Sequence, residues 1–109
     1  MTPLLVIVTT SSEEEAQKII KVLVGEHLAA CVQVLPGVTS TYHWKGSIET
    51  STEIVLTIKT SQELWPMVGE RVRELHSYEC PEIIAIPVIE ADPHYLKWWE
   101  KALNSEDQK

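Results

Sequence analysis

The short segment from His76 to Glu82 concentrates side chains that can bind a metal ion. It offers an imidazole from His76, carboxylates from Glu79 and Glu82, and a thiol from Cys80. Imidazole and thiolate are ligands that copper and zinc prefer. We therefore take His76, Glu79 and Cys80 as a candidate site for copper or another divalent cation. The alternative interpretation is that His76 only ends a helix, where an imidazolium is favoured.

Nucleophilic catalysis is the other chemistry that these residue types allow. Cys31 lies in an alternating apolar segment, a pattern typical of a small buried thiol. A nucleophile needs a base nearby, and only His27 lies close to Cys31 in the sequence. A pair of Glu82 and His76 has no recognisable catalytic spacing. We predict that the protein is not an enzyme.

A strand and a helix begin the set of elements that must position these residues. Residues 4–9 are almost entirely apolar and predict a strand. Ser12 and Glu15 match a capping box, in which the serine caps the helix and the glutamate reaches back to the serine N–H. The helix is predicted to end near Gly25. Its buried stripe is expected to hold Ala16, Ile19, Ile20, Leu23, Val24 and His27.

A long hairpin follows this helix. Residues 29–35 alternate in polarity, Pro36-Gly37 predicts a bend, and the chain is extended again to Trp44. Lys45-Gly46 predicts a turn into a return strand from Ile48 to about Thr60. That strand spans about 43 Å at roughly 3.3 Å per residue, whereas a compact domain of this size measures about 35 Å across. We expect the hairpin to overhang.

Two more helices and one strand complete the chain. Ser61 is expected to cap a second helix with the stripe Leu64, Val68, Val72 and Leu75, although Pro66 implies that the helix either starts nearer Trp65 or opens with a tight irregular turn. Pro87 places the strand over residues 83–89 at a sheet edge. Asp92-Pro93 predicts the start of a third helix. Its buried side is expected to hold Tyr95, Leu96, Trp98, Trp99, Ala102 and Leu103, and residues 105–109 are expected to fray.

This order of elements is that of the ferredoxin-like, or split βαβ, fold. We predict an α+β domain over residues 1–109, with two helices on one face of an antiparallel sheet and an extra C-terminal helix. The other sheet face stays bare in a monomer. The first strand is apolar on both faces, so this bare face is expected to pack against other subunits.

Composition excludes several partners. The net charge of −7 argues against a nucleic-acid binder, which needs clustered Lys and Arg, and suits metal cations better. No apolar run approaches the roughly 18 residues of a membrane span. The start of the sequence lacks the basic segment of a secretory signal, and two cysteines are few for a disulfide-stapled domain. We predict a cytoplasmic protein with reduced thiols.

Several motifs read together in order along the chain. They are LAACV from Leu28, STYHWKG from Ser40, Lys59-Thr60, HSYECPEI from His76 and YLKW from Tyr95. Over about residues 4–100 this set resembles the CutA family of divalent-cation tolerance proteins. The resemblance implies a ferredoxin-like protomer, a tight homotrimer related in architecture to PII signalling proteins, and a role in tolerance of copper and other divalent metals.

The resemblance also implies a cleft between subunits. Its lining positions match Tyr42, Trp44, Lys59, Tyr78, Glu82, Tyr95 and Trp98, and we assign Cys31 to the same cleft. Some members are credited with copper binding by a first-strand cysteine and paired histidines. Val8 and Leu75 occupy two of those places here, so only His76 remains. Ser77 stands where the family usually has proline.

Three functions stay open on these grounds. The first is a trimer that binds divalent metal or acts in metal homeostasis, and we favour it. The second is a PII-like small-molecule sensor that uses the clefts, although no glycine-rich phosphate loop is present. The third is a purely structural or anchoring trimer.

Overall fold

One four-stranded antiparallel sheet organises the molecule. The computed structural model describes residues 1–104, so the predicted frayed tail lies outside the described residues. The elements are β1 (Pro3–Thr10), α1 (Glu13–Gly25), β2 (Cys31–Trp44), β3 (Ser47–Ser61), α2 (Trp65–Leu75), β4 (Ile83–Pro87) and α3 (Pro93–Leu103). The strand order is β2-β3-β1-β4. The predicted α+β class and antiparallel sheet are confirmed.

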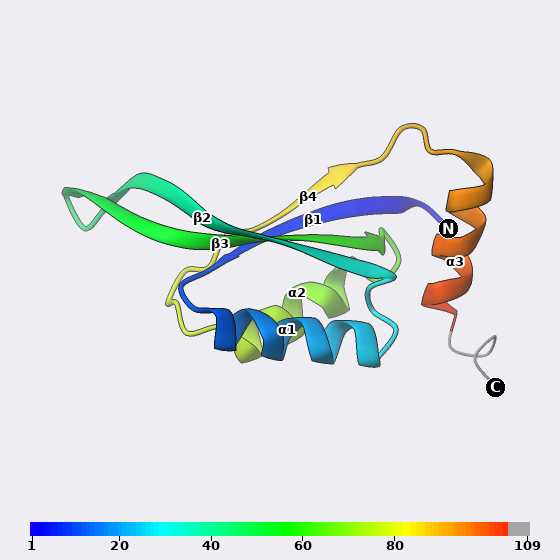
Figure 1. Cartoon of the computed structure of the whole chain (residues 1–109), viewed down its shortest axis with the longest axis horizontal. Coiled ribbons are helices and arrows are strands. Elements are labelled where there is room, and N and C mark those ends of the chain that lie inside the picture. The colour runs from blue at the N-terminus through cyan, green and yellow to red at the C-terminus, as the bar shows by residue number, and fades with distance from the viewer. Residues whose placement is uncertain (105–109) are drawn as a thin grey trace.

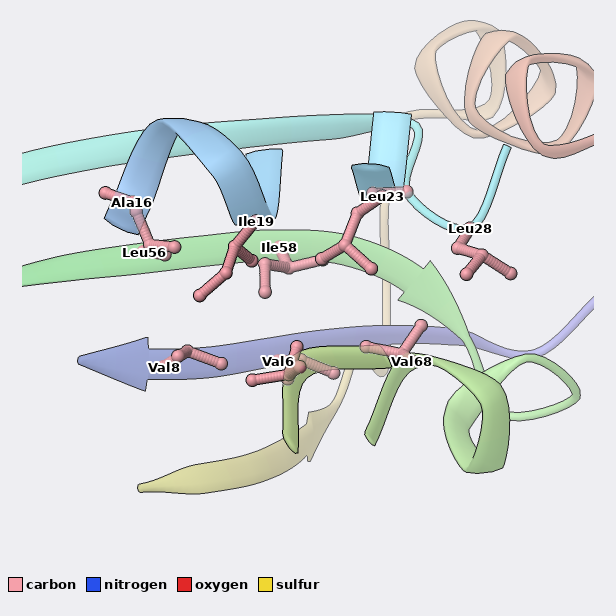
Figure 2. Packing of buried hydrophobic residues seen from close by; sticks show 11 residues of the cluster. Val6, Val8, Ala16, Ile19, Leu23, Leu28, Leu56, Ile58 and Val68 are labelled. Carbon is pink, nitrogen blue, oxygen red and sulfur yellow. The ribbon is translucent and has the colours of Figure 1, made fainter. Parts of the chain in front are cut away.

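Helices α1 and α2 cover the same face of this sheet, and α3 stands beyond one end of it (Figure 1). A core of buried apolar side chains lies between the sheet and the helices α1 and α2. Figure 2 shows Ile19 and Leu23 of α1 lying above Leu56 and Ile58 of β3. All four side chains are fully buried. Their removal from water is the main source of stability for the layered structure. None of the helices within residues 1–104 is long and apolar enough to cross a membrane.

The hairpin of β2 and β3 overhangs the rest of the sheet, as predicted. β1 pairs with β3 only as far as Thr10 and Ile54. Beyond that point β2 and β3 pair with each other alone, out to Trp44 and Ser47. The longest extent of the molecule is 48 Å, and Figure 1 shows the hairpin projecting away from the helices. We call residues 38–53 the hairpin arm.

Two local backbone features shape the arm. Lys45 and Gly46 both have positive φ, at 49° and 82°. Positive φ at both central residues is the requirement of the tight hairpin turn that matches strand twist. At the base of the arm the register shifts between Leu35 and Val38, where Gly37 has φ of 73°. The predicted bend at Pro36-Gly37 is therefore a bulge within one continuous strand.

The end of α1 differs from the sequence prediction. The helix ends at Gly25, and His27 lies outside it with φ of 58°. From this position His27 Nδ1 donates to the Ala102 carbonyl oxygen of α3 at 3.1 Å. The expected place of His27 in the buried stripe was therefore wrong. Val24, also expected in that stripe, is 42% exposed.

The start of α2 also required correction. Ser61 belongs to β3, and the N-cap position of α2 is Leu64, without a side-chain cap. Ser61 instead accepts a hydrogen bond from the Leu64 N–H at 3.3 Å within a tight turn. The start at Trp65 places Pro66 in the first turn, where its missing N–H costs nothing.

β4 and α3 match the predicted signals only in part. β4 lies at the sheet edge, as Pro87 predicted. The strand ends at Pro87, however, and does not continue to Ile89. Asp92 caps α3 as expected, accepting from two backbone N–H groups. Of the expected buried side of α3 only Trp99 is buried, because the helix meets the sheet at its end. Trp98 is 45% exposed.

Candidate functional site

A cleft opens between the hairpin arm and the loop that joins α2 to β4. Its volume is about 590 Å³. The end of β1, both strands of the arm and the loop contribute its walls. The lining residues are Thr9, Ser40, Thr41, Tyr42, Trp44, Glu53, Tyr78, Glu79, Cys80 and Glu82. The structure thus brings together Tyr42, Trp44, Tyr78 and Glu82 of the predicted cleft with two of the predicted metal ligands, Glu79 and Cys80.

Glu53 and Tyr78 form the polar centre of the cleft. The Tyr78 hydroxyl donates to Glu53 Oε2 at 2.8 Å, and Glu53 is only 7% exposed. Burial of the phenol, together with the hydrogen bond to this carboxylate and its charge, raises the pKa of Tyr78 to about 12. The phenol therefore stays protonated and keeps donating to Glu53 throughout the physiological pH range.

Alkaline pH is expected to weaken the fold through Tyr78. Because the pKa of Tyr78 in the folded state lies above the usual value of 10.0, its contribution to stability is complete below pH 10. It is lost as pH rises toward about 12. Ultraviolet titration of tyrosinate should show a late component that Tyr78→Phe removes. If Tyr78→Phe removes a component near pH 10 instead, the phenol is not held by Glu53.

His76 lies behind this centre with a fully buried imidazole. Its Nε2 is 2.6 Å from the Thr9 carbonyl oxygen, which can only accept, so Nε2 carries the proton. Its Nδ1 accepts from the Tyr78 backbone N–H at 3.0 Å. Both ring nitrogens are thus engaged, and the ring also lies 4.7 Å from the Tyr78 ring. His76 fixes the loop that carries Tyr78.

Glu15 holds the same loop from α1. Its carboxylate accepts from both the backbone N–H and the hydroxyl of Ser77, the latter at 3.1 Å. The Ser12 side chain caps Glu15 N–H at 3.2 Å, as predicted. The expected reach of Glu15 back to Ser12 is replaced by these contacts to Ser77. A proline in place of Ser77 could not donate either hydrogen bond.

The predicted metal ligands do not form a ready coordination set. His76 has no free lone pair for a metal, because Nδ1 accepts from Tyr78 and Nε2 is protonated. Across the described residues, 1–104, no three His, Cys, Asp or Glu side chains are grouped so that they could hold a metal ion. The triad of His76, Glu79 and Cys80 therefore does not fit a resident metal in this arrangement. Glu79 and Cys80 are exposed on the cleft wall.

The remaining predicted cleft residues lie elsewhere on the sheet. Lys59 Nζ donates to the Tyr95 hydroxyl at 2.8 Å, and the Tyr95 ring lies 5.3 Å from that of Trp98. Cys31 is the β2 partner of Lys59 in the sheet register. This second group does not line the cleft within one protomer. In one chain the predicted set therefore separates into two groups.

Sequence reasoning missed Glu53, and it assigned Glu15 to the helix cap without foreseeing its contacts to Ser77. Glu53 stands in a strand, where glutamate is depleted, between polar and apolar segments of β3. A glutamate at such a position in a strand indicates that the carboxylate of Glu53 has a specific partner. No sequence signal reveals that Tyr78 is the partner, because the two are brought together only by the packing of the loop against the arm.

Known proteins similar to this chain share one family. The family model described as CutA1 divalent ion tolerance protein matches residues 4–102. The divalent-cation tolerance protein CutA of Thermus thermophilus is 46% identical over 93 residues, which cover 85% of this chain and 90% of that protein. Protein CutA of Mus musculus is 43% identical over 98 residues, covering 90% of this chain. The matched region spans 55% of the mouse protein.

Solved structures agree in fold. The crystal structure of CutA from Xylella fastidiosa has a TM-score of 0.91 at 41% identity, covering 95% of this chain and 100% of that one. The periplasmic divalent cation tolerance protein CutA from Archaeoglobus fulgidus has a TM-score of 0.90 at 35% identity, covering 94% and 99%.

Proposed function

The chain belongs to the CutA1 divalent ion tolerance family, and on that premise we propose that it is a non-enzymatic homotrimer that binds copper or another divalent cation. The observation that carries the proposal is the cleft wall. Glu53, Glu79 and Glu82 contribute carboxylates there, and Cys80 contributes a thiol. The protein's net charge of −7 adds a field that attracts cations.

The cation is proposed as exchangeable cargo held at the exposed part of the cleft. Cys80 and Glu79 are its proposed ligands, because both are exposed there. His76 is proposed to act indirectly, by fixing the loop that presents them. Since no three ligands are preassembled within residues 1–104, we expect weak to moderate affinity.

Zinc is a suitable calorimetric probe because it does not oxidise thiols. Cys80→Ala and Glu79→Gln are each expected to weaken zinc binding about tenfold, because each removes one ligand. Glu14→Gln is the matched control for Glu79→Gln, since Glu14 is an exposed carboxylate of α1 outside the cleft, and it should bind zinc as the wild type does. Equal affinity for zinc in wild type and Cys80→Ala would reject the cleft as the cation site.

Assembly into a trimer is supported by the apolar surface that one protomer leaves open. The sheet face away from α1 and α2 exposes Leu35 at 60%, Ile84 at 48% and Ile86 at 42%. The arm adds Trp44 and Ile48. Apolar side chains gathered on one sheet face and on an overhanging arm are typical of an interface. We propose that ferredoxin-like protomers pack through these surfaces.

Truncation of Trp44 is expected to weaken this assembly. An aromatic anchor in an interface typically contributes about 2 kcal/mol or more. Trp44→Ala should therefore dissociate on dilution before the wild type does, with light scattering as the measurement. Met67→Ala truncates an exposed apolar side chain of α2, outside the arm and the predicted cleft between subunits, and tests whether loss of any exposed apolar group has this effect. If Trp44→Ala keeps the wild-type mass but melts earlier, Trp44 stabilises the protomer.

A PII-like sensor function is the second candidate, and the cleft volume favours it. About 590 Å³ lies within the range of small-molecule sites.

Cytoplasmic location is also proposed, supported by the free thiols of Cys31 and Cys80.

A further inference from the structure

We propose that the Glu53 carboxylate of each subunit pairs with the Lys59 ammonium of the neighbouring subunit, so that a second copy of this chain completes the cleft. The inference deepens the proposed homotrimer and rests on it. Three features of one protomer carry it: an unpaired charge of each sign, an apolar sheet face that joins the two charges, and a spacing along β3 that no contact within the chain can bridge.

Glu53 places an unpaired negative charge at one end of the sheet face. The residue is 7% exposed, and the hydrogen bond that its carboxylate accepts comes from the neutral phenol of Tyr78. Among residues 1–104 no lysine, arginine or histidine nitrogen forms an ion pair with Glu53. Packing of the arm on a neighbouring subunit removes the remaining water from this carboxylate. A carboxylate without water is costly unless a positive charge accompanies it.

Lys59 places the matching positive charge toward the other end of the same strand. Its Nζ donates to the Tyr95 hydroxyl at 2.8 Å and lies 5.1 Å from the centroid of the Tyr95 ring. Both contacts come from a neutral side chain, and no carboxylate within residues 1–104 forms an ion pair with Lys59. Lys59 is half-buried in one protomer. Its ammonium therefore keeps a full charge for a partner outside the chain.

Glu53 and Lys59 share the sheet face that α1 and α2 leave open. Ile58 of β3 points into the core beneath the helices, so its neighbour Lys59 points the opposite way, and Glu53 follows the same alternation. The exposed side chains of Leu35 and Ile84 lie on this face between the two charges. A second subunit that covers these apolar side chains also removes both charges from water. Pairing across the interface offsets that cost.

The pair forms between subunits because it cannot form within one. Glu53 and Lys59 are six residues apart on one strand, which separates them by about 20 Å at roughly 3.3 Å per residue. A ring of three subunits joins two different patches of neighbouring copies. The Glu53 end and the Lys59 end of the open face are two such patches with opposite charge. Each of the three interfaces in the ring then holds one ion pair.

A double-mutant cycle on trimer dissociation tests the pair, with light scattering on dilution as the measurement. Glu53→Gln and Lys59→Met each leave one buried charge without a partner, so each should raise the chain concentration at half-dissociation at least about tenfold. The double variant should raise it no further than the larger single effect, because no charge is left unpaired. Two residues this far apart in one chain would instead give effects that multiply. Glu14→Gln and Lys21→Met, both exposed on α1, are the controls and should each change it less than about twofold.

Carbodiimide coupling of the wild type tests the same contact without a Glu53 variant. The reagent activates the Glu53 carboxylate, the Lys59 Nζ attacks its carbonyl carbon, and a urea departs, which leaves an amide between the two side chains. Because the spacing along β3 keeps these groups apart within one chain, that amide joins two subunits. Peptide mass spectrometry of the covalent dimer should find it. Lys59→Arg keeps the charge but removes the amine that couples, and should lack this product.

The possible outcomes separate this inference from the homotrimer on which it rests. Multiplied effects in the double variant, or covalent products that never contain the amide between Glu53 and Lys59, would overturn the ion pair. If the wild type is nevertheless a trimer in those experiments, the proposed assembly stands without the pair. A wild-type monomer would reject the assembly and the pair together.

Discussion

Replacement of His76 by alanine is expected to lower the free energy of unfolding by about 3 kcal/mol. The imidazole is fully buried and bridges β1 to the loop after α2. Its removal leaves the Thr9 carbonyl and the Tyr78 N–H without their partner, and each such group costs about 1 to 3 kcal/mol when buried. The space left by the ring adds a cavity term.

Urea unfolding at a fixed chain concentration measures this effect, because oligomer formation makes stability depend on concentration. His94→Ala is the matched control, since His94 is exposed and uses only its backbone N–H in a hydrogen bond. The control should stay within about 0.5 kcal/mol of wild type. A loss below about 1 kcal/mol for His76→Ala would mean that the ring does not hold the loop.

Replacement of Trp99 by alanine is expected to cost about 4 kcal/mol of unfolding free energy. Trp99 is 2% exposed, and its Nε1 donates to the Thr60 carbonyl oxygen at 3.0 Å. Trp99 is the one buried side chain among the residues of α3, and it packs this helix against the end of β3 beside the hydrogen bonds from His27 to Ala102 and from Lys59 to Tyr95. The substitution removes both the packed indole and the hydrogen bond, so α3 should detach before the sheet unfolds.

Hydrogen exchange separates local from global loss, because detachment of α3 exposes its amides while those of β1 and β3 stay protected. Lys97→Ala serves as the control within the same helix, as Lys97 is exposed. It should change stability by less than about 1 kcal/mol. Equal effects of the two substitutions would show that α3 is not anchored through Trp99.

Local signals predicted most of the fold. Neighbouring residues alone determine three features that were predicted correctly. These are the hairpin turn at Lys45-Gly46, the edge position of β4 with its proline, and the start of α3 at Asp92-Pro93. The predictions were wrong where contacts with a segment distant in the sequence determine whether a side chain is buried. His27 left the stripe of α1 because its ring reaches the end of α3. Trp98 is exposed because α3 meets only the end of the sheet.

The candidate site was predictable by residue type but not by geometry. The loop from Tyr78 to Glu82 and the aromatic residues of the arm were singled out from the sequence, and they meet in the cleft. The role of His76 depended on Thr9, which comes from the first strand. Pairing of Tyr78 with Glu53 likewise depends on how the loop packs against β3. No local pattern encodes contacts between segments so far apart in the chain.

Native mass spectrometry with and without added copper tests the central claim most directly, because it reports subunit number and bound metal together. The account predicts a species of three times the 12.3 kDa chain mass that gains copper, with less copper retained by Cys80→Ala than by the wild type. A monomer, or a trimer that takes up no copper at any concentration below precipitation, would contradict it.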